Sequence, residues 1–594
     1  ILRRNAPDPS SYRGQWMWPL DFHHPDVREM LAEFLAGVGE RYRDDDRIFT
    51  YTTAWEPQLN EGSIGEWGRW PSGGRTPAAN GAFRAYLREK LGTIEALNAA
   101  WESEYLSFGA IEPPADVHHG PPEERATLLS QLNRGACPPL YYEHNRFLLD
   151  SYAEYLAWCY QTLKAADPDT PISVSPSYGL IDGYLAVGRD SFQWAEKACD
   201  IYGSEMTSSM EEVFQYSIQR ALDRPTGIFE FIWNGPENWS NPSEDVARAA
   251  ARRNLWRMVA WGRTVIALFG YGDTYGGKAY NNMAVFESDS HLLRRSAGII
   301  GPLKRKLRSM EDVWLKVPVI EPKIALLKPS TSQICAWPWE IVTSVSQGLH
   351  DVLHGNQYHY AFVPEEHVLL GRDHLERYRV LVLPHASHFP PGLTERILPW
   401  VKSGGVLIVS GIAGGFTPYG RRDGALMEAV FGELEYQSWL VDGVGGELRW
   451  MLTVDELRPQ AEYVGDRPGE ILLARYGRGK VLLAARLADL APGGAAVPIM
   501  HQLIDGAAPR RVWVEGAQLE MVARGTDRRW HVVLINPSSS RPAEARICLA
   551  RPCRRAVDRG IEGGFPIPVQ TAERGEYFDT VLAPGEGTMV QIDW

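Results

Sequence analysis

The stretch Gly227-Ile-Phe-Glu-Phe-Ile-Trp-Asn-Gly-Pro-Glu-Asn-Trp239 runs from an apolar β-type segment into a loop that contains two tryptophans. One carboxylate, Glu230, interrupts the apolar residues, and the segment breaks at the turn Asn234-Gly235-Pro236. Burying an unpaired carboxylate is costly, so Glu230 is expected to be ion-paired, solvated at the strand end, or retained for chemistry. A lone acid beside Trp233 and Trp239 at the end of a strand is typical of a sugar site.

A structural ion pair is the alternative for Glu230, with Arg252 or Arg253 as its partner. A second segment of the same kind lies earlier in the chain. Residues 48–55 are β-branched and aromatic, and they stop at Glu56 because the proline after it cannot continue a central strand. Two predicted strands therefore each end on a glutamate, which favours a chemical role.

Helices and strands alternate through the first 320 residues, which is typical of parallel β/α units. The strands are expected at about residues 48, 172, 200, 228 and 265, and the helices between them include 25–42, 83–101 and 142–164. A closed (β/α)8 TIM barrel needs eight strands at about 30 residues per unit, so roughly 90 residues are expected before Ile1. We therefore predict an α/β fold in which residues 1–320 form a TIM barrel with three strands missing.

Two further domains are predicted after the proline-containing linker 317–322. Short apolar strands alternating with helices predict a doubly wound, flavodoxin-like parallel sheet over residues 321–508. From Val512 onward the strands are short, alternate in polarity and are divided by proline and glycine turns, which predicts a small antiparallel, β-sandwich-like domain over residues 509–594. The strands of the doubly wound domain are expected at 323–327, 380–384 and 405–410.

Composition limits the partners of this 594-residue chain. Its net charge of -13 and pI near 5.7 argue against a nucleic-acid or anionic-membrane partner, which needs a basic surface. No run of 18 apolar residues is present, so no membrane span is predicted. We expect reduced thiols, no metal, no cofactor and a cytoplasmic location. The cysteines are too sparse for a disulfide scaffold and lack zinc-site spacing: Cys137, Cys159, Cys199, Cys335, Cys548 and Cys553.

Glu56 and Glu230 are the predicted catalytic pair. In a β/α barrel the chemistry lies at the carboxyl ends of the strands, where both residues are expected. Retaining glycoside hydrolysis uses two carboxyl groups about 5–5.5 Å apart, of which one protonates the leaving oxygen and the other attacks the anomeric carbon. Two glutamates on different strands of one barrel can meet that distance.

Three features resemble glycoside hydrolase family 42, the β-galactosidases of the retaining barrel clan. They are the separation of 174 residues between the two glutamates, the segment 83–101, and the Glu230 run that ends at Gly235-Pro-Glu-Asn-Trp239. The resemblance implies that Glu56 is the general acid/base, that Glu230 is the nucleophile and that Trp239 contacts the sugar. It also implies that the five predicted strands are strands 4 to 8 of the barrel.

The resemblance extends to the later domains. Residues 323–508 are similar to the amidotransferase-like trimerisation domain of the family, which implies a homo-oligomer and, by resemblance, a trimer. An amidotransferase needs a cysteine nucleophile on a sharp turn after a strand, but His385 follows Pro384 and Gly411 follows Ser410. This domain is therefore predicted to be a scaffold for subunit contacts.

Some positions depart from the family pattern and indicate a divergent member. In the clan an asparagine precedes the acid/base and binds the sugar 2-hydroxyl, whereas Trp55 stands there. The loop from Glu230 to Trp239 is one residue longer than usual, and the metal-binding cysteine cluster of some relatives is not visible. Asn60-Glu61 restores the Asn-Glu dipeptide but lies five residues past the strand end, so Glu61 is the less favoured acid/base.

Further side chains are predicted near the sugar. The aromatic rings of Trp55, Trp233 and Trp239 can stack on the apolar face of a sugar. Tyr202 ends a predicted strand, where it either hydrogen-bonds the nucleophile or packs inside the barrel. The other acids are predicted to be rim or substrate-binding residues, or simply solvated: Glu66, Glu205, Glu237 and Asp273.

The sequence thus predicts a retaining glycoside hydrolase that cleaves terminal β-linked sugars, with β-galactosides favoured. Trp55 leaves the sugar open, so an arabinopyranoside, a mannoside or a glucoside is one alternative. The other alternative is a non-catalytic carbohydrate-binding or assembly protein on a decayed barrel, which Trp55 and the missing strands favour.

Overall fold

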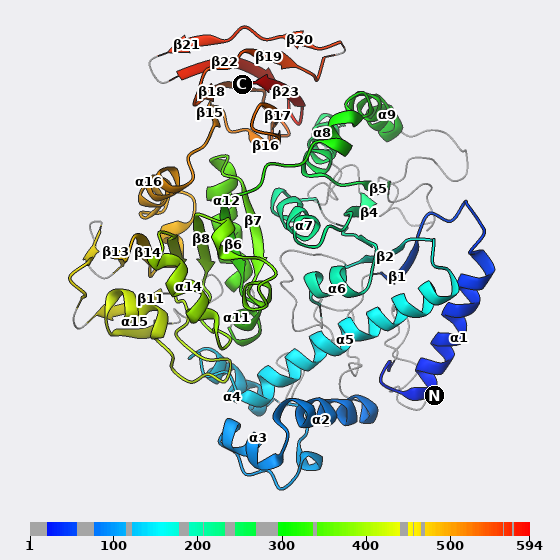
Figure 1. The fold of residues 1–594 in the computed structure, drawn as a ribbon, viewed down its shortest axis with the longest axis vertical. Helices are drawn as coiled ribbons and strands as arrows, with labels where there is room; N and C mark the ends of the chain where they lie inside the picture. Colours follow the sequence, from blue (N-terminus) through cyan, green and yellow to red (C-terminus); the bar gives the residue numbers. More distant parts are fainter. Residues whose placement is uncertain are drawn as a thin grey trace.

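The computed structural model describes residues 21–55, 76–114, 122–176, 189–205, 207–231, 244–268, 295–336, 341–439, 449–454, 457–464, 470–561, 563–572 and 575–594. These residues form an N-terminal region up to residue 320, a central region over 321–508 and a C-terminal region from 509 onward (Figure 1). Each region is built on its own sheets. Both predicted domain boundaries fall between helices and strands.

Five short parallel strands follow one another in chain order in the N-terminal region. β1 pairs with β2, β2 with β3 and β4 with β5, and a parallel bridge between Tyr202 and Thr226 joins β3 to β4. All five carboxyl ends therefore lie at one edge, and the prediction of five parallel strands is confirmed. The strands are β1 (Tyr51–Trp55), β2 (Ile172–Ser175), β3 (Ile201–Tyr202), β4 (Gly227–Phe231) and β5 (Val265–Leu268).

Helices cover one face of these strands. Apolar side chains of α5, α6, α7 and α8 pack in one core with Val174, Tyr202 and Ile228. The long helix α5 also packs along α1 (Figure 1). The helices of this region are α1 (Pro25–Tyr42), α2 (Pro77–Leu91), α3 (Ile94–Trp101), α4 (Pro122–Leu132), α5 (Pro139–Ala166), α6 (Ser191–Lys197), α7 (Ser209–Leu222), α8 (Glu244–Trp261), α9 (Arg295–Arg308) and α10 (Glu311–Lys316).

The central region is a mixed sheet with the strand order β12-β13-β14-β9-β8-β6-β7. The five strands from β14 to β7 are parallel and doubly wound, as predicted, whereas the antiparallel β12 and β13 extend the sheet beyond the prediction. The strands are β6 (Ile324–Lys328), β7 (Tyr360–Pro364), β8 (Val380–Pro384), β9 (Val406–Ser410), β12 (Ala461–Tyr463), β13 (Ile471–Tyr476) and β14 (Gly479–Ala484), with a separate pair β10 (Leu434–Trp439) and β11 (Arg449–Val454). The helices are α11 (Ser330–Cys335), α12 (Ile341–Gly355), α13 (Glu365–Leu369), α14 (Leu393–Lys402), α15 (Ala425–Phe431) and α16 (Val497–Ala507).

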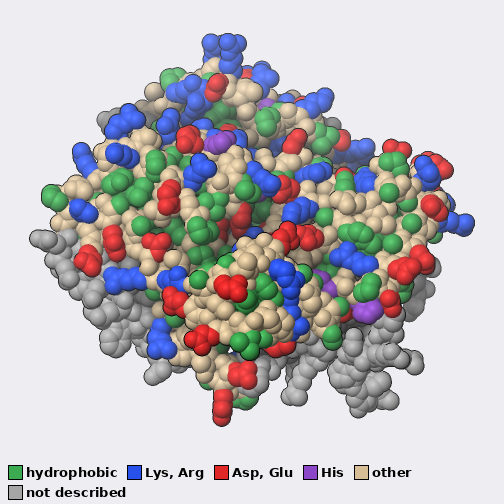
Figure 2. Space-filling view, turned by 60° about the horizontal axis from the view of Figure 1, so that its bottom comes forward, with side chains coloured by type: hydrophobic (Ala, Val, Ile, Leu, Met, Phe, Trp, Pro, Cys, Tyr) green, Lys and Arg blue, Asp and Glu red, His purple; other side chains and the backbone are tan. Residues whose placement is uncertain are grey.

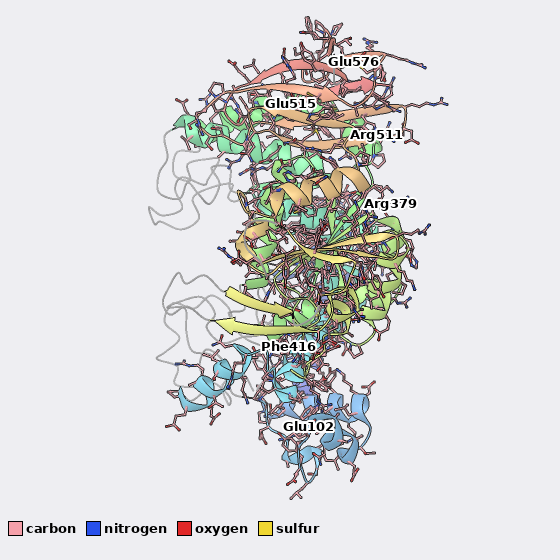
Figure 3. All side chains as sticks on the ribbon, turned by 90° about the vertical axis from the view of Figure 1, so that its left-hand side faces the viewer. Glu102, Arg379, Phe416, Arg511, Glu515 and Glu576 are labelled. Carbon is pink, nitrogen blue, oxygen red and sulfur yellow. The ribbon has the colours of Figure 1, made fainter. Side chains whose placement is uncertain are left out.

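Two antiparallel sheets form the C-terminal region, as the alternating pattern predicts. Their strand orders are β15-β18-β22-β21 and β16-β17-β23-β19-β20, and they share an apolar core. In Figure 3, Glu515 and Glu576 mark this region at one end of the molecule, and Glu102 marks α3 at the other. The strands are β15 (Val512–Gly516), β16 (Glu520–Gly525), β17 (Arg529–Ile535), β18 (Ala543–Leu549), β19 (Arg555–Asp558), β20 (Phe565–Pro566), β21 (Gln570–Ala572), β22 (Gly575–Leu582) and β23 (Gly587–Asp593).

Charged side chains of both signs share the surface. In Figure 2, lysine and arginine side chains alternate with aspartate and glutamate side chains across the visible face. Within the described part of the chain, no helix has the length and apolar character needed to cross a membrane. The predicted lack of nucleic-acid and membrane partners stays a prediction.

A buried carboxylate joins the C-terminal region to both other regions. Arg257 of α8 and Glu520 of β16 are 8 % and 7 % exposed and form a two-pronged ion pair. His354 of α12 lies 3.8 Å from the same carboxylate. Burial alone would raise the pKa of Glu520, but the Arg257 charge and then His354 outweigh it, so the pKa lies well below its ordinary value.

Glu520→Gln is expected to destabilise the protein by about 3 kcal/mol, because Arg257 would keep a buried charge without its counter-charge. Urea unfolding followed by tryptophan fluorescence measures this change. Glu515→Gln, at an exposed position of β15 in the same region, is the matched control and should alter stability by less than about 0.5 kcal/mol. Equal stability of the two variants would contradict the proposed importance of the ion pair.

Another buried carboxyl group lies where α5 meets the central region. Arg146 of α5 pairs with Glu366 at 2.9 Å. The adjacent Glu365 is 1 % exposed and accepts a hydrogen bond from the Thr331 N–H at 2.6 Å. Burial, reinforced by the Glu366 carboxylate, raises the pKa of Glu365 to about 8. Glu365 is therefore uncharged at neutral pH.

This raised pKa makes stability depend on pH. Between about pH 4.5 and 8 an unfolded glutamate is ionised while folded Glu365 keeps its proton, so rising pH favours unfolding across this window. Glu365→Gln ionises in neither state, so its melting temperature relative to the parent protein should rise from pH 5 to pH 8. Glu366→Gln, which removes one carboxylate partner of Arg146 and leaves Asp150 at 3.3 Å, is the control and should be less stable than the parent at both pH values. A Glu365→Gln difference that is the same at both pH values would refute the assignment.

Candidate active site

Side-chain alternation divides the five N-terminal strands into two faces. Directly paired residues share a face, and successive residues of a strand point to opposite faces. Ala54, Val174 and Tyr202 form one paired row, and all three belong to the core under the helices. The neighbouring pair, Thr52 and Ser173, lies on the opposite face, where the two hydroxyl oxygens are 2.9 Å apart. The first face is called the helix face below, and the second the inner face.

A β-bulge in β4 turns Glu230 onto the inner face. Ile228 and Phe231 pair with residues of β5 that are only two positions apart, so β4 carries one extra residue between them. Both Ile228 and Phe231 belong to the core on the helix face, so the two residues between them, Phe229 and Glu230, lie on the inner face. In a regular strand Glu230 would share the helix face with Ile228. The bulge therefore decides where this carboxylate lies, and Glu230 is partly exposed there.

β1 has the same feature near its end. Thr52 and Ala54 pair with consecutive residues of β2, so Thr53 is an extra residue. The strand ends at Trp55, and the predicted acid/base Glu56 follows it in the sequence. Bulges re-aim side chains and are frequent beside active sites. A bulge thus lies at, or just before, each glutamate of the predicted catalytic pair.

A further acid, Glu205, lies near the same edge of the sheet. It is 7 % exposed, and the Ser175 hydroxyl donates a hydrogen bond to it at 3.4 Å. Hydrogen bonds from the Ser204 N–H to the Gly227 carbonyl and from the Phe229 N–H to the Ser204 carbonyl continue the pairing of β3 with β4. Glu205, the residue after Ser204, therefore lies opposite Phe229 of β4. The interpretation of Glu205 as simply solvated is wrong, because neighbouring strands bury it.

Arg263, just before β5, ties β3 to β4 from the helix face. Its guanidinium donates to Glu212 of α7 at 2.9 Å, to the Ser204 hydroxyl at 2.9 Å and to the Gly227 carbonyl at 2.5 Å. Burial raises the pKa of Glu212, and the Arg263 charge opposes that rise. The sequence did not reveal this group, because a single arginine between two elements carries no periodic signal.

The structure separates two of the predicted site residues. Glu230 lies on the inner face, whereas Tyr202 is fully buried in the core on the helix face. Tyr202 was expected either to hydrogen-bond the nucleophile or to pack against its neighbours, and its burial agrees with packing. Contact of Tyr202 with a sugar stays a prediction. Outside the described side chains lie Trp55, Glu56, Trp233 and Trp239, and also the competing acids Glu61, Glu66, Glu237 and Asp273.

In an amidotransferase, the turn after a strand such as β8 carries the nucleophilic cysteine. His385 occupies it in a left-handed conformation with φ 47°. Burial lowers the pKa of His385 to about 3. His388 donates a hydrogen bond from Nε2 to the Gly135 carbonyl at 3.0 Å, and its Nδ1 lies 3.0 Å from the Ser387 hydroxyl oxygen. Phe416, labelled in Figure 3, stacks on the His388 ring. Among the described residues no group of three or more histidine, cysteine, aspartate or glutamate side chains is placed to hold a metal ion, and the six cysteines are free thiols.

Residues 13–299 match the sequence profile of glycoside hydrolase family 42, whose description is β-galactosidase. Over these residues, just under half of the chain, the sequence is similar to glycoside hydrolase family 42. It is 22 % identical over 409 residues to the β-galactosidase BgaP of Planococcus sp. (strain L4), and 25 % identical over 422 residues to the β-galactosidase Pbg of Clostridium perfringens. These matches cover 66 % and 65 % of this chain and 55 % and 54 % of the relatives, so the chain spans about half the length of the curated relatives it matches.

The fold of this chain is shared with a solved structure. It superposes on the crystal structure of the β-galactosidase from Bacillus circulans sp. alkalophilus with a TM-score of 0.71 at 17 % identity. The superposition covers 96 % of this chain and 83 % of that chain. At this identity the likeness shows a common fold.

If a sugar binds on the inner face, Tyr202→Phe should leave the turnover of an aryl β-galactoside within about twofold of the parent protein, because the sheet would separate the Tyr202 hydroxyl from that sugar. Steady-state kcat and KM measure this. Tyr160→Phe is the matched control, because it removes a partly buried tyrosine hydroxyl that donates a hydrogen bond to Asp200 at 2.9 Å. A large loss of kcat in Tyr202→Phe alone, at unchanged melting temperature, would show that Tyr202 reaches the site.

Proposed function

We propose that this protein is a retaining glycoside hydrolase that cleaves terminal β-linked sugars as a β-galactosidase does. The observation that carries the proposal is the bulge in β4, which turns Glu230 to the inner face at the carboxyl edge of parallel strands. That edge holds the chemistry in β/α barrels. The family 42 profile and the relatives named β-galactosidase support the same activity.

In this proposal Glu230 is the nucleophile and Glu56 is the general acid/base. Glu230 attacks the anomeric carbon and forms a covalent glycosyl ester, while Glu56 protonates the leaving oxygen and then activates the water that hydrolyses the ester. The two steps need the carboxyl groups about 5–5.5 Å apart. Assigning β1–β5 to strands 4 to 8 of a (β/α)8 barrel supports this separation, because the strands run parallel in chain order.

The sugar is proposed to be a β-galactoside, bound against the rings of Trp55, Trp233 and Trp239. The names of the relatives support galactose. Trp55 stands where the clan has an asparagine for the 2-hydroxyl, so arabinopyranosides, mannosides and glucosides belong in the same substrate panel. The double displacement uses side-chain carboxyls and water, so the proposal includes no cofactor.

A homotrimer assembled through the central region, in the cytoplasm, completes the proposal. It is supported by the resemblance of residues 323–508 to a trimerisation domain and by a sheet of the doubly wound type. Light scattering coupled to size exclusion tests the subunit number directly. The alternative is a non-catalytic sugar-binding protein, which Trp55 favours and which predicts binding without cleavage.

Glu230→Gln should lower turnover of an aryl β-galactoside by about 10⁴-fold or more, because the amide cannot attack the anomeric carbon. Release of the aryl group measures turnover, and circular dichroism checks the fold. Glu40→Gln, an exposed position of α1, is the control and should keep parental turnover.

Retained turnover in Glu230→Gln would show that another residue is the nucleophile. If the parent protein cleaves no glycoside of the panel while galactose shifts its tryptophan fluorescence, the sugar-binding alternative replaces the hydrolase.

A further inference from the structure

Gly203 lies beside the bulge on the inner face. It directly follows Tyr202, the last residue of β3. Hydrogen bonds to β4 continue past the end of β3 and set Gly203 level with Gly227, two residues before Phe229. A Cβ atom at position 203 would overlap the ring carbons Cδ2 and Cε2 of Phe229 and approach the Val174 carbonyl oxygen to 3.2 Å. The Phe229 ring therefore fills the space that a side chain at position 203 would need.

Phe229 is one of the two bulge residues and directly precedes Glu230. It is 8 % exposed, but the core that contains Ile228 and Phe231 does not include it among the described residues. Its ring is thus held by the inner face of β3 and not by the helices. Because Phe229 and Glu230 share a peptide bond, the position of the ring constrains the direction of the Glu230 side chain.

We propose that Gly203 and Phe229 are positioning residues for Glu230: the ring seated over Gly203 holds the β4 bulge in the form that aims the carboxylate into the site. The inference rests on the proposed role of Glu230 as nucleophile. Attack depends on near-attack geometry, in which a misplacement of about 1 Å can cost about 10²-fold in rate. A methyl group at position 203 would displace the ring and, through it, the carboxylate.

The test isolates the attack step. A 2-deoxy-2-fluoro-β-galactosyl fluoride reacts with a retaining enzyme when the nucleophile carboxylate bonds to the anomeric carbon and fluoride leaves, and the resulting ester accumulates. Its inactivation rate constant therefore reports attack by Glu230, and peptide mass spectrometry identifies the labelled residue. The affinity of a non-covalent galactose-type inhibitor, measured on the same samples, reports binding alone.

We expect Gly203→Ala to slow labelling by about 10²-fold while the inhibitor affinity changes less than about threefold. Phe229→Leu alone should slow labelling about tenfold, because the smaller side chain fills the space over Gly203 less completely and no atom is added at position 203. The double variant Gly203→Ala/Phe229→Leu should recover to within about tenfold of the parent, because the smaller side chain leaves room for the methyl group. Gly81→Ala, at a helical position with open space around it, is the control and should label at the parental rate.

Parental labelling rates in Gly203→Ala would overturn the proposal, and so would a loss that Phe229→Leu does not relieve in the double variant. If Gly203→Ala fails to fold, the Phe229→Leu rate and the double variant decide the matter by the same criteria. An unlabelled Glu230 in the parent protein would instead refute the proposed function, and the positioning role would fall with it.

Discussion

A β-strand offers its side chains only two directions, and this constraint organises the N-terminal region. One direction serves the core under the helices, which takes Val174, Tyr202 and Ile228. The other direction is left for polar groups such as Ser173 and Glu205. Glu230 belongs by simple parity with the core, and the single extra residue of β4 moves it to the polar side. The chemistry proposed for Glu230 therefore depends on a local break in the regular pairing.

The same constraint explains how much the sequence could predict. Elements with one strongly apolar face or a compact apolar run were found close to their bounds, including α1 and β8. β7 (Tyr360–Pro364) is as fully buried as β8 but was missed. A run without alternation is recognised by its composition alone, and Tyr-Ala-Phe-Val is less uniformly aliphatic than the Val-Leu repeat of β8. The bulges could not be predicted, because they depend on the register of a neighbouring strand that periodicity does not specify.

The candidate site was predicted in part for related reasons. The position of Glu230 at a strand end followed from the apolar run around it and from the turn after it. Strands that are distant in sequence decide on which face of the sheet Tyr202 lies and how deeply Glu205 is buried. These two environments could therefore be assigned only from the strand pairing in the structure. The Arg263 ties to Glu212 and Ser204 join three elements in the same way.

Buried ionic contacts recur where the three regions meet. Arg257 and Glu520 join the N-terminal to the C-terminal region, and Lys328 of the central region lies 3.8 Å from Asp190 of the N-terminal region. Such pairs gain little net free energy over apolar packing, since desolvation offsets attraction, but losing one partner is costly. Their value here lies in permitting one relative placement of the regions and penalising others.

Helix α5 makes that placement stiff. Its 28 residues span about 42 Å, and its first turns pack against α11 of the central region while its later turns pack against α1 and β1. A continuous helix that is packed at both ends resists bending, so it opposes relative displacement of α11 and β1.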